Sequence, residues 1–340
     1  MIDADGGQSQ CQLVMEITFG FSQSQCLFAA VEVGLFNLLH KGALQFQEII
    51  KQAGISPRGG RSLLDALVVL GLMIRTNDEY SNSPAATRYL VESSPFYVGD
   101  LVKFVAARMY PVWAKLSDAI NTGKPQNEAL TELDYYANLT SDTIRLERFL
   151  KGMVGLSARP ADLISRLFPW QKYKTFIDLG GASGAFAVHL LKAHDHLAGG
   201  VFELPGVRPF FERTSLELSD RLEFYEGNFF VDTLPSADVF ILGNILHNWN
   251  SDEKTTLLSK VQRAVKSGGA IVVYEWFVDD SREKLLGLLD GLNMLLVTKT
   301  GCSVTEGECK LLLERAGFSE VATLVSDYPY GVIVGKKTRL

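Results

Sequence analysis

The sequence of 340 residues predicts an α/β fold, in which a mostly parallel sheet is covered by helices on both faces and follows an N-terminal helical domain. Three observations predict this fold. From residue 174 onward, short apolar segments alternate with amphipathic ones. Residues 13–40 instead carry apolar side chains at helical spacing. Finally, the glycines at 180, 181 and 184 lie where a tight turn would join the first strand to a helix.

The composition is that of an ordinary globular protein with room for two domains. Hydrophobic residues make up 47% of the chain and the formal net charge is −6, which is unfavourable for a nucleic-acid partner. No apolar run is long enough to cross a membrane, and the first residues lack the pattern of a signal peptide. The four cysteines have no CxxC spacing. We therefore expect a cytoplasmic protein with reduced thiols and no membrane partner.

Residues 1–100 are expected to form an all-helical, winged-helix dimerisation domain. The segment 13–40 is apolar around most of a helix, so we expect a homodimer that buries it. Two helices and a small hairpin over residues 44–85, with a turn at Asn77 and Asp78, match a winged helix. A winged-helix transcription regulator is the alternative. However, Arg61 is the only basic residue inside the second of these helices, which favours a structural role over DNA binding.

Residues 101–340 are expected to form the catalytic domain, with 101–165 as a helical linker or substrate lid. Prolines punctuate this first part, and the alternation of strands and helices then begins. We expect strands at 175–179, 200–203, 222–226, 237–242, 270–276, 320–325 and 331–335, and helices at 186–192, 208–218, 252–265 and 310–316.

The glycine-rich segment 176–186 carries the strongest functional signal. An apolar strand ends in Asp178, glycines follow, and a second apolar stretch ends in Glu203 about 25 residues later, where a carboxylate holds the ribose in nucleotide-binding units. A dinucleotide fingerprint fits poorly, because alanines occupy its third and sixth positions. A hydrolase nucleophile elbow lacks its last glycine and leaves both carboxylates unexplained. A purely structural turn is the remaining alternative.

A histidine follows the strand expected at 237–242, in the sequence Leu246-His247-Asn248-Trp249. In open α/β sheets, ligands bind beyond the carboxyl ends of the strands, so His247 is expected to face the same crevice as the glycines. An imidazole there could take a proton from a phenol. The phenol pKa is about 10 and that of imidazole about 6.5, so the transfer is uphill unless it is concerted with bond formation.

Several motifs together resemble those of one enzyme family. Asp178 to Gly184 resembles motif I of S-adenosylmethionine-dependent methyltransferases, and Leu246 to Trp249 resembles the L-H-D-W signature of the plant- and hydroxyindole-type O-methyltransferases, which include the acetylserotonin O-methyltransferases. Other segments match in order, over about residues 12–337: Phe149-x3-Met153-x3-Ser157, Phe202–Val207, Gly227–Phe230, Val273–Glu275 and Leu292–Leu295.

The resemblance implies a Rossmann-like methyltransferase sheet that binds S-adenosylmethionine and transfers its methyl group to a hydroxyl of a small aromatic or polyketide-like acceptor. His247 would be the general base and Glu275 would orient it. The implied cofactor contacts are Ser157, Asp178, Gly180, Gly181, Gly184, Glu203, Leu204, Asn228, Phe229 and Asn244. The implied acceptor contacts are Phe149, Met153, Asn248, Asn293 and Met294.

Three positions depart from the family pattern. Asn228 and Asn248 stand where the motifs have aspartate, and Ser303 stands where the family has a second glutamate. Because serine carries no charge, we expect one carboxylate beside His247 rather than two. These departures leave alternatives on the same scaffold, namely C- or N-methylation, or a pericyclase, cyclase or lyase reaction that uses the bound cofactor without transferring its methyl group.

A metal site is not expected. The histidines at 189, 194 and 196 invite that interpretation, but the first two are five residues apart on a helix and therefore do not share a face. His194 and His196 lie at the carboxyl end of that helix, which favours cations in any case.

Overall fold

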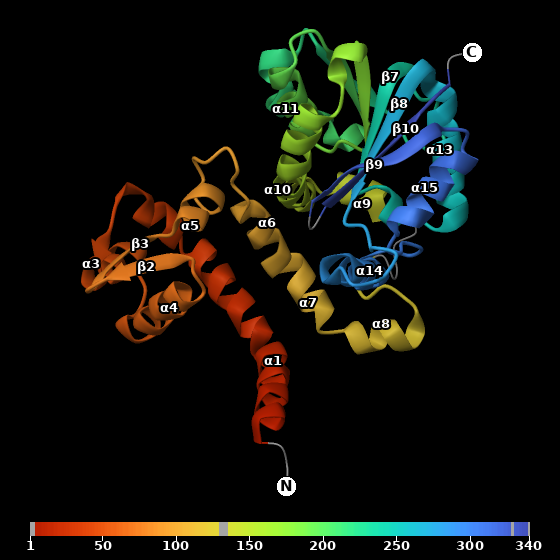
Figure 1. Ribbon diagram of the computed structural model, residues 1–340. Helices are drawn as coiled ribbons and strands as arrows, with labels where there is room; N and C mark the ends of the chain where they lie inside the picture. Colours follow the sequence, from red (N-terminus) through yellow and green to blue (C-terminus); the bar gives the residue numbers. More distant parts are fainter. Residues whose placement is uncertain (1–3, 129–134, 328–329, 339–340) are drawn as a thin grey trace. The chain divides into compact units, whose positions relative to one another are not determined.

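The computed structural model describes residues 4–128, 135–327 and 330–338. The chain divides into two compact units, Met1–Arg108 and Met109–Leu340, which follow one another in the colours of Figure 1. Within the described residues, no helix is both long enough and apolar enough to span a membrane.

The N-terminal unit is a helical module with a small antiparallel sheet of order β1-β3-β2, as expected for a winged helix. Its core contains Leu35, Phe36, Ile49, Leu64 and Tyr80, all nearly inaccessible to solvent. The elements are α1 (Ala4–Glu32), α2 (Leu35–Leu38), β1 (Leu44–Gln45), α3 (Phe46–Ala53), α4 (Pro57–Val69), β2 (Met73–Thr76), β3 (Glu79–Asn82), α5 (Pro84–Tyr89) and α6 (Gly99–Phe104).

Two features of this unit bear on its role. Arg61, one of two basic residues in α4 together with Arg58, donates to Asp78 at 2.7 Å and to the Tyr80 hydroxyl at 3.0 Å, so its guanidinium is engaged within the module. The first helix begins at Ala4, earlier than the expected residue 13, and its apolar side chains are largely exposed in the single chain. Phe19 and Phe21, for example, are each 53% exposed.

The second unit begins with a helical stretch, as expected. After the π-helical segment Val105–Met109 come α7 (Tyr110–Trp113), α8 (Leu116–Thr122), α9 (Tyr135–Ser141) and the long α10 (Thr143–Leu167). Asp142 caps α10, since its side chain accepts a hydrogen bond from the backbone N–H of Arg145.

A seven-stranded sheet of order β6-β5-β4-β7-β8-β10-β9 forms the centre of this unit, and it confirms the expected Rossmann-like fold. The strands are β4 (Thr175–Leu179), β5 (Ala198–Glu203), β6 (Leu222–Glu226), β7 (Ala237–Gly243), β8 (Val265–Glu275), β9 (Ser319–Asp327) and β10 (Tyr330–Lys336). The strands β4 to β8 are parallel, whereas β10 runs antiparallel to both of its neighbours, β8 and β9. The strand order reverses between β4 and β7, which is where ligands bind in such sheets.

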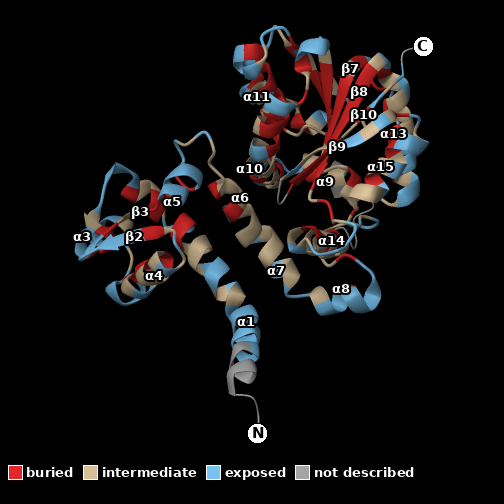
Figure 2. Cartoon of the chain, in the orientation of Figure 1, coloured by how far each residue is buried: buried red, intermediate tan, exposed pale blue. Residues whose placement is uncertain are grey.

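Helices cover both faces of the sheet, with α10 and α11 on one side and α13 and α15 on the other (Figure 1). The central strands are consequently buried between two apolar cores (Figure 2). The remaining helices are α11 (Ala185–Ala193), α12 (Arg208–Ser215), α13 (Ser251–Ala264), α14 (Leu285–Val297) and α15 (Glu306–Arg315), and short 3₁₀ turns include η5 (Pro205–Val207) and η7 (Leu246–Asn248). We had not expected a helix at α14.

Candidate active site

A cavity of about 450 Å³ opens at the carboxyl ends of β4, β5 and β7. Its lining includes every predicted cofactor residue except Gly184: Ser157, Asp178, Gly180, Gly181, Glu203, Leu204, Asn228, Phe229 and Asn244. It also includes Phe149, Met153 and Asn248, which we had assigned to the acceptor. The other predicted residues, His247, Glu275, Asn293 and Met294, are not part of this lining.

The turn between β4 and α11 explains why this segment contains glycines. Gly180 has a φ of +70°, and a Cβ built there would lie 2.5 Å from Ile245. Gly181 has no room either, since its Cβ would lie 2.5 Å from a carboxylate oxygen of Asp178. Gly184 has a φ of +81° and begins α11, so its role here is conformational. The glycines are therefore required by the conformation of the turn and by its close packing, and Gly180 and Gly181 line the cavity.

Glu203 faces this turn from the end of β5. Its Oε2 accepts a hydrogen bond from the Ala182 N–H at 3.1 Å, and its Oε1 accepts one from the Leu204 N–H at 2.8 Å. Burial raises the pKa of Glu203, and these two backbone donors lower it in part. The carboxylate is thereby fixed at the edge of the cavity, across from the glycines.

Asp178 adds a second buried carboxyl group. It is 3% exposed, and its Oδ2 has no hydrogen-bond partner among the described residues. Burial, with a further contribution from the charge on Glu203, raises the pKa of Asp178 to about 7. A buried carboxylate oxygen without a hydrogen-bond partner lowers the stability of the folded protein. A ligand that brings hydrogen-bond donors or positive charge would supply the missing partner. A nucleoside with ribose hydroxyls, an amino group and a sulfonium, as in S-adenosylmethionine, fits this set of groups.

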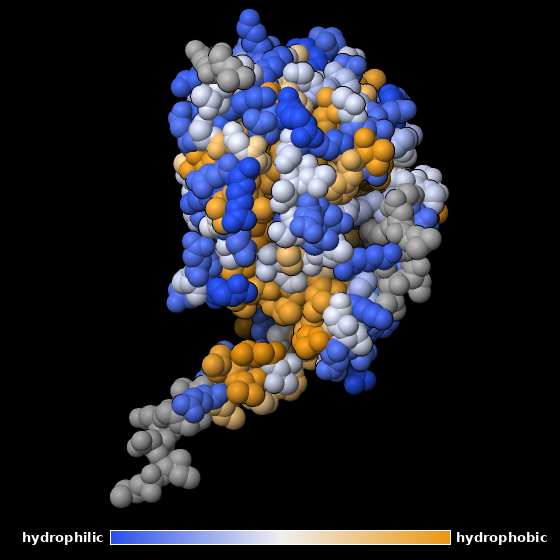
Figure 3. Space-filling model, turned by 90° about the vertical axis from the view of Figure 1, so that its right-hand side faces the viewer, coloured by the Kyte–Doolittle hydropathy of each residue, from blue (hydrophilic) through white to orange (hydrophobic). Residues whose placement is uncertain are grey.

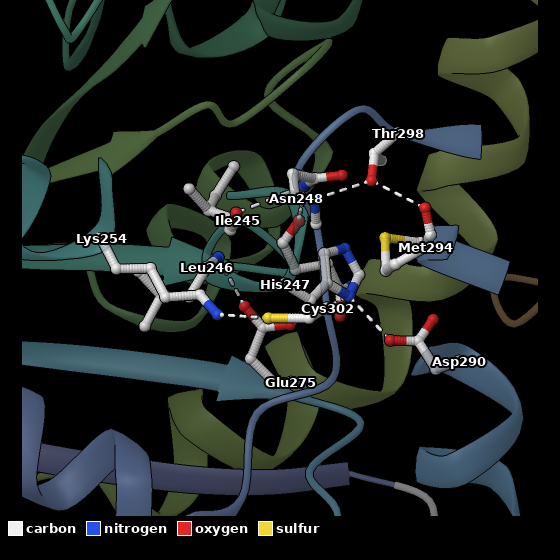
Figure 4. A network of polar contacts seen from close by, with 12 residues as sticks. Ile245, Leu246, His247, Asn248, Lys254, Glu275, Asp290, Met294, Thr298 and Cys302 are labelled. Carbon is white, nitrogen blue, oxygen red and sulfur yellow. Dashed lines mark hydrogen bonds and ion pairs between the residues drawn. The ribbon is translucent and has the colours of Figure 1, made fainter. Parts of the chain in front are cut away.

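His247 lies on η7, just beyond β7, between two carboxylates (Figure 4). Its Nδ1 is 2.8 Å from Oδ2 of Asp290 on α14 and 3.3 Å from Oε2 of Glu275 at the end of β8. The first contact is a hydrogen bond, whereas the second is an ion-pair contact, because Glu275 Oε2 accepts no hydrogen bond within the described part of the chain. Glu275 Oε1 accepts from the Leu246 N–H at 2.8 Å, which fixes the carboxylate beside the imidazole.

These surroundings make His247 more basic. Burial by itself disfavours the imidazolium, but the charges of Glu275 and Asp290 outweigh it and raise the pKa of His247 to about 9. Lys254 is also buried nearby and acts in the opposite direction. Its ammonium donates to Cys302 Sγ at 3.2 Å, and the Cys302 N–H donates to the His247 carbonyl at 2.9 Å.

The expectation of a single carboxylate beside His247 is wrong, because Asp290 supplies the second. Ser303 lies next to Gly291, where a Cβ would come within 2.8 Å of the serine Cβ. Sequence reasoning missed Asp290 because no helix was expected there. A signal was present, since Asp290 is the only charged residue in α14 and precedes Asn293 by three positions, which places the two on neighbouring turns.

Four further residues were considered from the sequence, two for the acceptor and two for a metal. Asn293 has a buried side-chain oxygen without a partner among the described residues. Met294 is 5% exposed, and its carbonyl accepts from the hydroxyl of Thr298 at 2.7 Å. The rings of His194 and His196 contact backbone carbonyls instead of a shared ligand. No group of three or more potential metal ligands lies within residues 4–128, 135–327 and 330–338.

Comparisons with known proteins match nearly the whole length of the chain. A family model described as an O-methyltransferase domain covers residues 113–319, and an O-methyltransferase dimerisation domain covers residues 15–92. The tetracenomycin polyketide synthesis 8-O-methyl transferase TcmO of Streptomyces glaucescens is 39% identical over 96% of both chains. The N,N-dimethyltransferase OxyT of Streptomyces rimosus is 34% identical over 91% of both.

A solved structure agrees with these matches. Human N-acetylserotonin methyltransferase in complex with S-adenosylmethionine superimposes with a TM-score of 0.89 at 28% identity, over 99% of both chains. Together with the glycine turn, the carboxylate at 203 and the histidine beyond β7, these findings confirm the resemblance seen in the sequence. The chain belongs to the S-adenosylmethionine-dependent O-methyltransferase family.

Proposed function

We propose that the chain transfers a methyl group from S-adenosylmethionine to a hydroxyl of a small aromatic, polyketide-like acceptor, with His247 as the general base. The observation that carries the proposal is the buried imidazole held by Asp290 and Glu275 beyond the carboxyl end of β7, beside the cofactor cavity. The 39% identity to TcmO, named for polyketide synthesis, supports this class of acceptor.

The cavity residues have separate tasks in this proposal. Glu203 accepts hydrogen bonds from the ribose, and Asn228 with Phe229 contacts the adenine. The glycine turn and Asp178 hold the methionine end, where the unpaired carboxylate oxygen complements positive charge. The cofactor, once bound, supplies the electrophilic methyl group. Phe149, Met153, Asn293 and Met294 are proposed to contact the acceptor.

The two carboxylates beside His247 bring its pKa closer to that of a phenol. An unperturbed imidazole with a pKa of about 6.5 lies about 3.5 units below a phenol, which corresponds to about 5 kcal/mol for the proton transfer. With its pKa at about 9, His247 reduces the gap to about 1 unit, or about 1.4 kcal/mol. Glu275 and Asp290 then stabilise the imidazolium as it forms, because each places negative charge beside Nδ1.

N-methylation is the second candidate, favoured by the 34% identity to OxyT. We would incubate the protein with S-adenosylmethionine labelled with ¹³C at the methyl group and a panel of hydroxylated and amino-substituted polycyclic arenes and hydroxyindoles. The products are located by NMR. A labelled methyl on oxygen, with stoichiometric S-adenosylhomocysteine, supports the proposal. A labelled methyl on nitrogen alone supports the second candidate, and a changed product without label supports a non-methylating reaction. Both of these outcomes overturn O-methylation.

We also propose that α1 forms the centre of a homodimer interface. Apolar residues gather along the exposed helix in Figure 3, where Leu13, Ile17, Phe19 and Phe21 are all more than half exposed in the single chain. The match to a dimerisation domain supports this assignment. In sedimentation equilibrium, Phe19→Lys combined with Phe21→Lys is expected to give monomers, whereas Ile144→Lys, on the exposed face of α10, remains dimeric. A dimeric double variant would contradict the assignment.

A further inference from the structure

Two residues far apart in the sequence meet at the wall of the cofactor cavity. Tyr136 lies on α9 and Asn248 at the end of η7, and both line the cavity. The Tyr136 hydroxyl donates to Asn248 Oδ1 at 2.9 Å. We propose that this hydrogen bond, the Tyr136–Asn248 bridge, holds α9 against the cavity and controls how fast the cofactor leaves. The proposal rests on the cofactor site described under the proposed function.

The other polar atoms of Asn248 are also committed to the cavity wall. Its Nδ2 donates to the carbonyl oxygens of Asn244 at 3.0 Å and Ile245 at 3.3 Å. Because a carbonyl can only accept, these partners fix the orientation of the amide and leave Oδ1 for the tyrosine. A carboxylate could not donate to either carbonyl, so this arrangement requires asparagine where the family motif has aspartate. Both N–H groups of Asn248 thus donate to the backbone of the loop after β7.

Asn248 also stabilises an unusual backbone. Asn244 has a φ of +53°, a left-handed conformation that asparagine tolerates better than most residues. The side chain of Asn248 accepts a hydrogen bond from Tyr136 and donates one to the carbonyl of Asn244, which lines the cavity. Movement of α9 would therefore be transmitted to the loop after β7.

The opposite end of α9 is fixed by close packing. A Cβ at Gly206, in η5, would lie 2.7 Å from both the carbonyl oxygen and the Cβ of Thr140, so the helix packs directly against the turn that follows Glu203. Leu139 is buried in the core at 2% exposure. At the first turn of α9, the Tyr136 ring lies 5.9 Å from that of Trp249, and the hydroxyl makes the bridge. The bridge is thus a polar attachment of the first turn of α9 to the cavity wall.

The test is a double-mutant cycle on cofactor release. Surface plasmon resonance would give the dissociation rate constant of S-adenosylhomocysteine for the parent protein, Tyr136→Phe, Asn248→Ala and the double variant. Loss of one neutral hydrogen bond is expected to accelerate release about 2- to 10-fold in Tyr136→Phe. The phenylalanine retains the ring contact with Trp249. In the Asn248→Ala background the same substitution is expected to have no further effect.

A matched control is available outside the cavity. The Tyr225 hydroxyl donates to Glu223 at an exposed site, so Tyr225→Phe removes the same group and should leave release unchanged. An unchanged release rate in Tyr136→Phe, or full additivity in the cycle, would overturn the bridge. Failure of the parent protein to bind S-adenosylhomocysteine at all would overturn the cofactor site itself, which keeps the two failures distinct.

Discussion

Replacement of Asp290 by asparagine tests the proton-transfer chemistry most sharply. The Asp290→Asn side chain keeps the size of the original and can still accept from His247 Nδ1, but it removes the negative charge that lies 2.8 Å from the ring. The geometry of the imidazole is therefore preserved while its basicity changes. No other residue in α14 is charged, so α14 offers no substitute for the lost carboxylate.

The expected size of the effect follows from the contact. An opposite charge this close shifts a pKa by about 1–3 units, and each unit corresponds to about 1.4 kcal/mol. The pKa of His247 is about 9 with both carboxylates present. Because the base must be neutral to accept a proton, activity rises with pH to a plateau above this pKa. Asp290→Asn should move the rise about 1–3 units lower in pH and reduce the plateau, since the base is weaker.

The assay is the pH dependence of kcat/KM for the acceptor at saturating cofactor, compared between variants. Asp118→Asn is the matched control, because it removes the same charge from an exposed position of α8. Asp290→Glu retains the charge and should keep the inflection near that of the parent. An unchanged inflection in Asp290→Asn, with the folded state intact by circular dichroism, would refute the role of this charge.

Three further predictions concern the same site. His247→Ala should lower kcat about 10²- to 10⁴-fold while calorimetry gives nearly the parent affinity for S-adenosylhomocysteine; unchanged turnover would remove the base assignment. Glu203→Gln should weaken S-adenosylhomocysteine binding about 10- to 100-fold, since a charged hydrogen-bond acceptor is lost, whereas Glu217→Gln on the exposed surface should not. The pKa of His247 is raised above its ordinary value, so its stabilising contribution is complete below pH 6.5 and lost as pH rises through about 9. The free energy of unfolding, measured by urea titration relative to His247→Gln, should fall by about 3 kcal/mol over that range, and a constant difference would contradict the shifted pKa.

The sequence predicted those parts of the site that local structure determines. The segment from β4 to α11 contains its own strand end, its own glycine turn and its own helix start, so the position of the cavity followed from residues 176–186. The location of Glu203 followed for the same reason, because β5 lies beside β4 in register. In both cases, the residues belong to one strand–helix–strand unit, β4-α11-β5.

Asp290 could not be placed in this way. Its helix, α14, is apolar almost all round and contains two glycines, so the usual amphipathic pattern is missing. Asp290 and His247 are 43 positions apart in the sequence. Their contact depends on how α14 packs near η7 in the folded chain. The Tyr136–Asn248 contact spans 112 positions and depends on tertiary packing in the same way. Such contacts belong to the folded chain rather than to any local motif.

A co-crystal structure with S-adenosylhomocysteine is the most direct test of the account. We expect the ribose hydroxyls on Glu203, the amino acid end along the turn at Gly180 and Gly181, and the sulfur on the side of the cavity that faces His247. A nucleoside bound elsewhere on the protein, or one whose sulfur points away from His247, would contradict it.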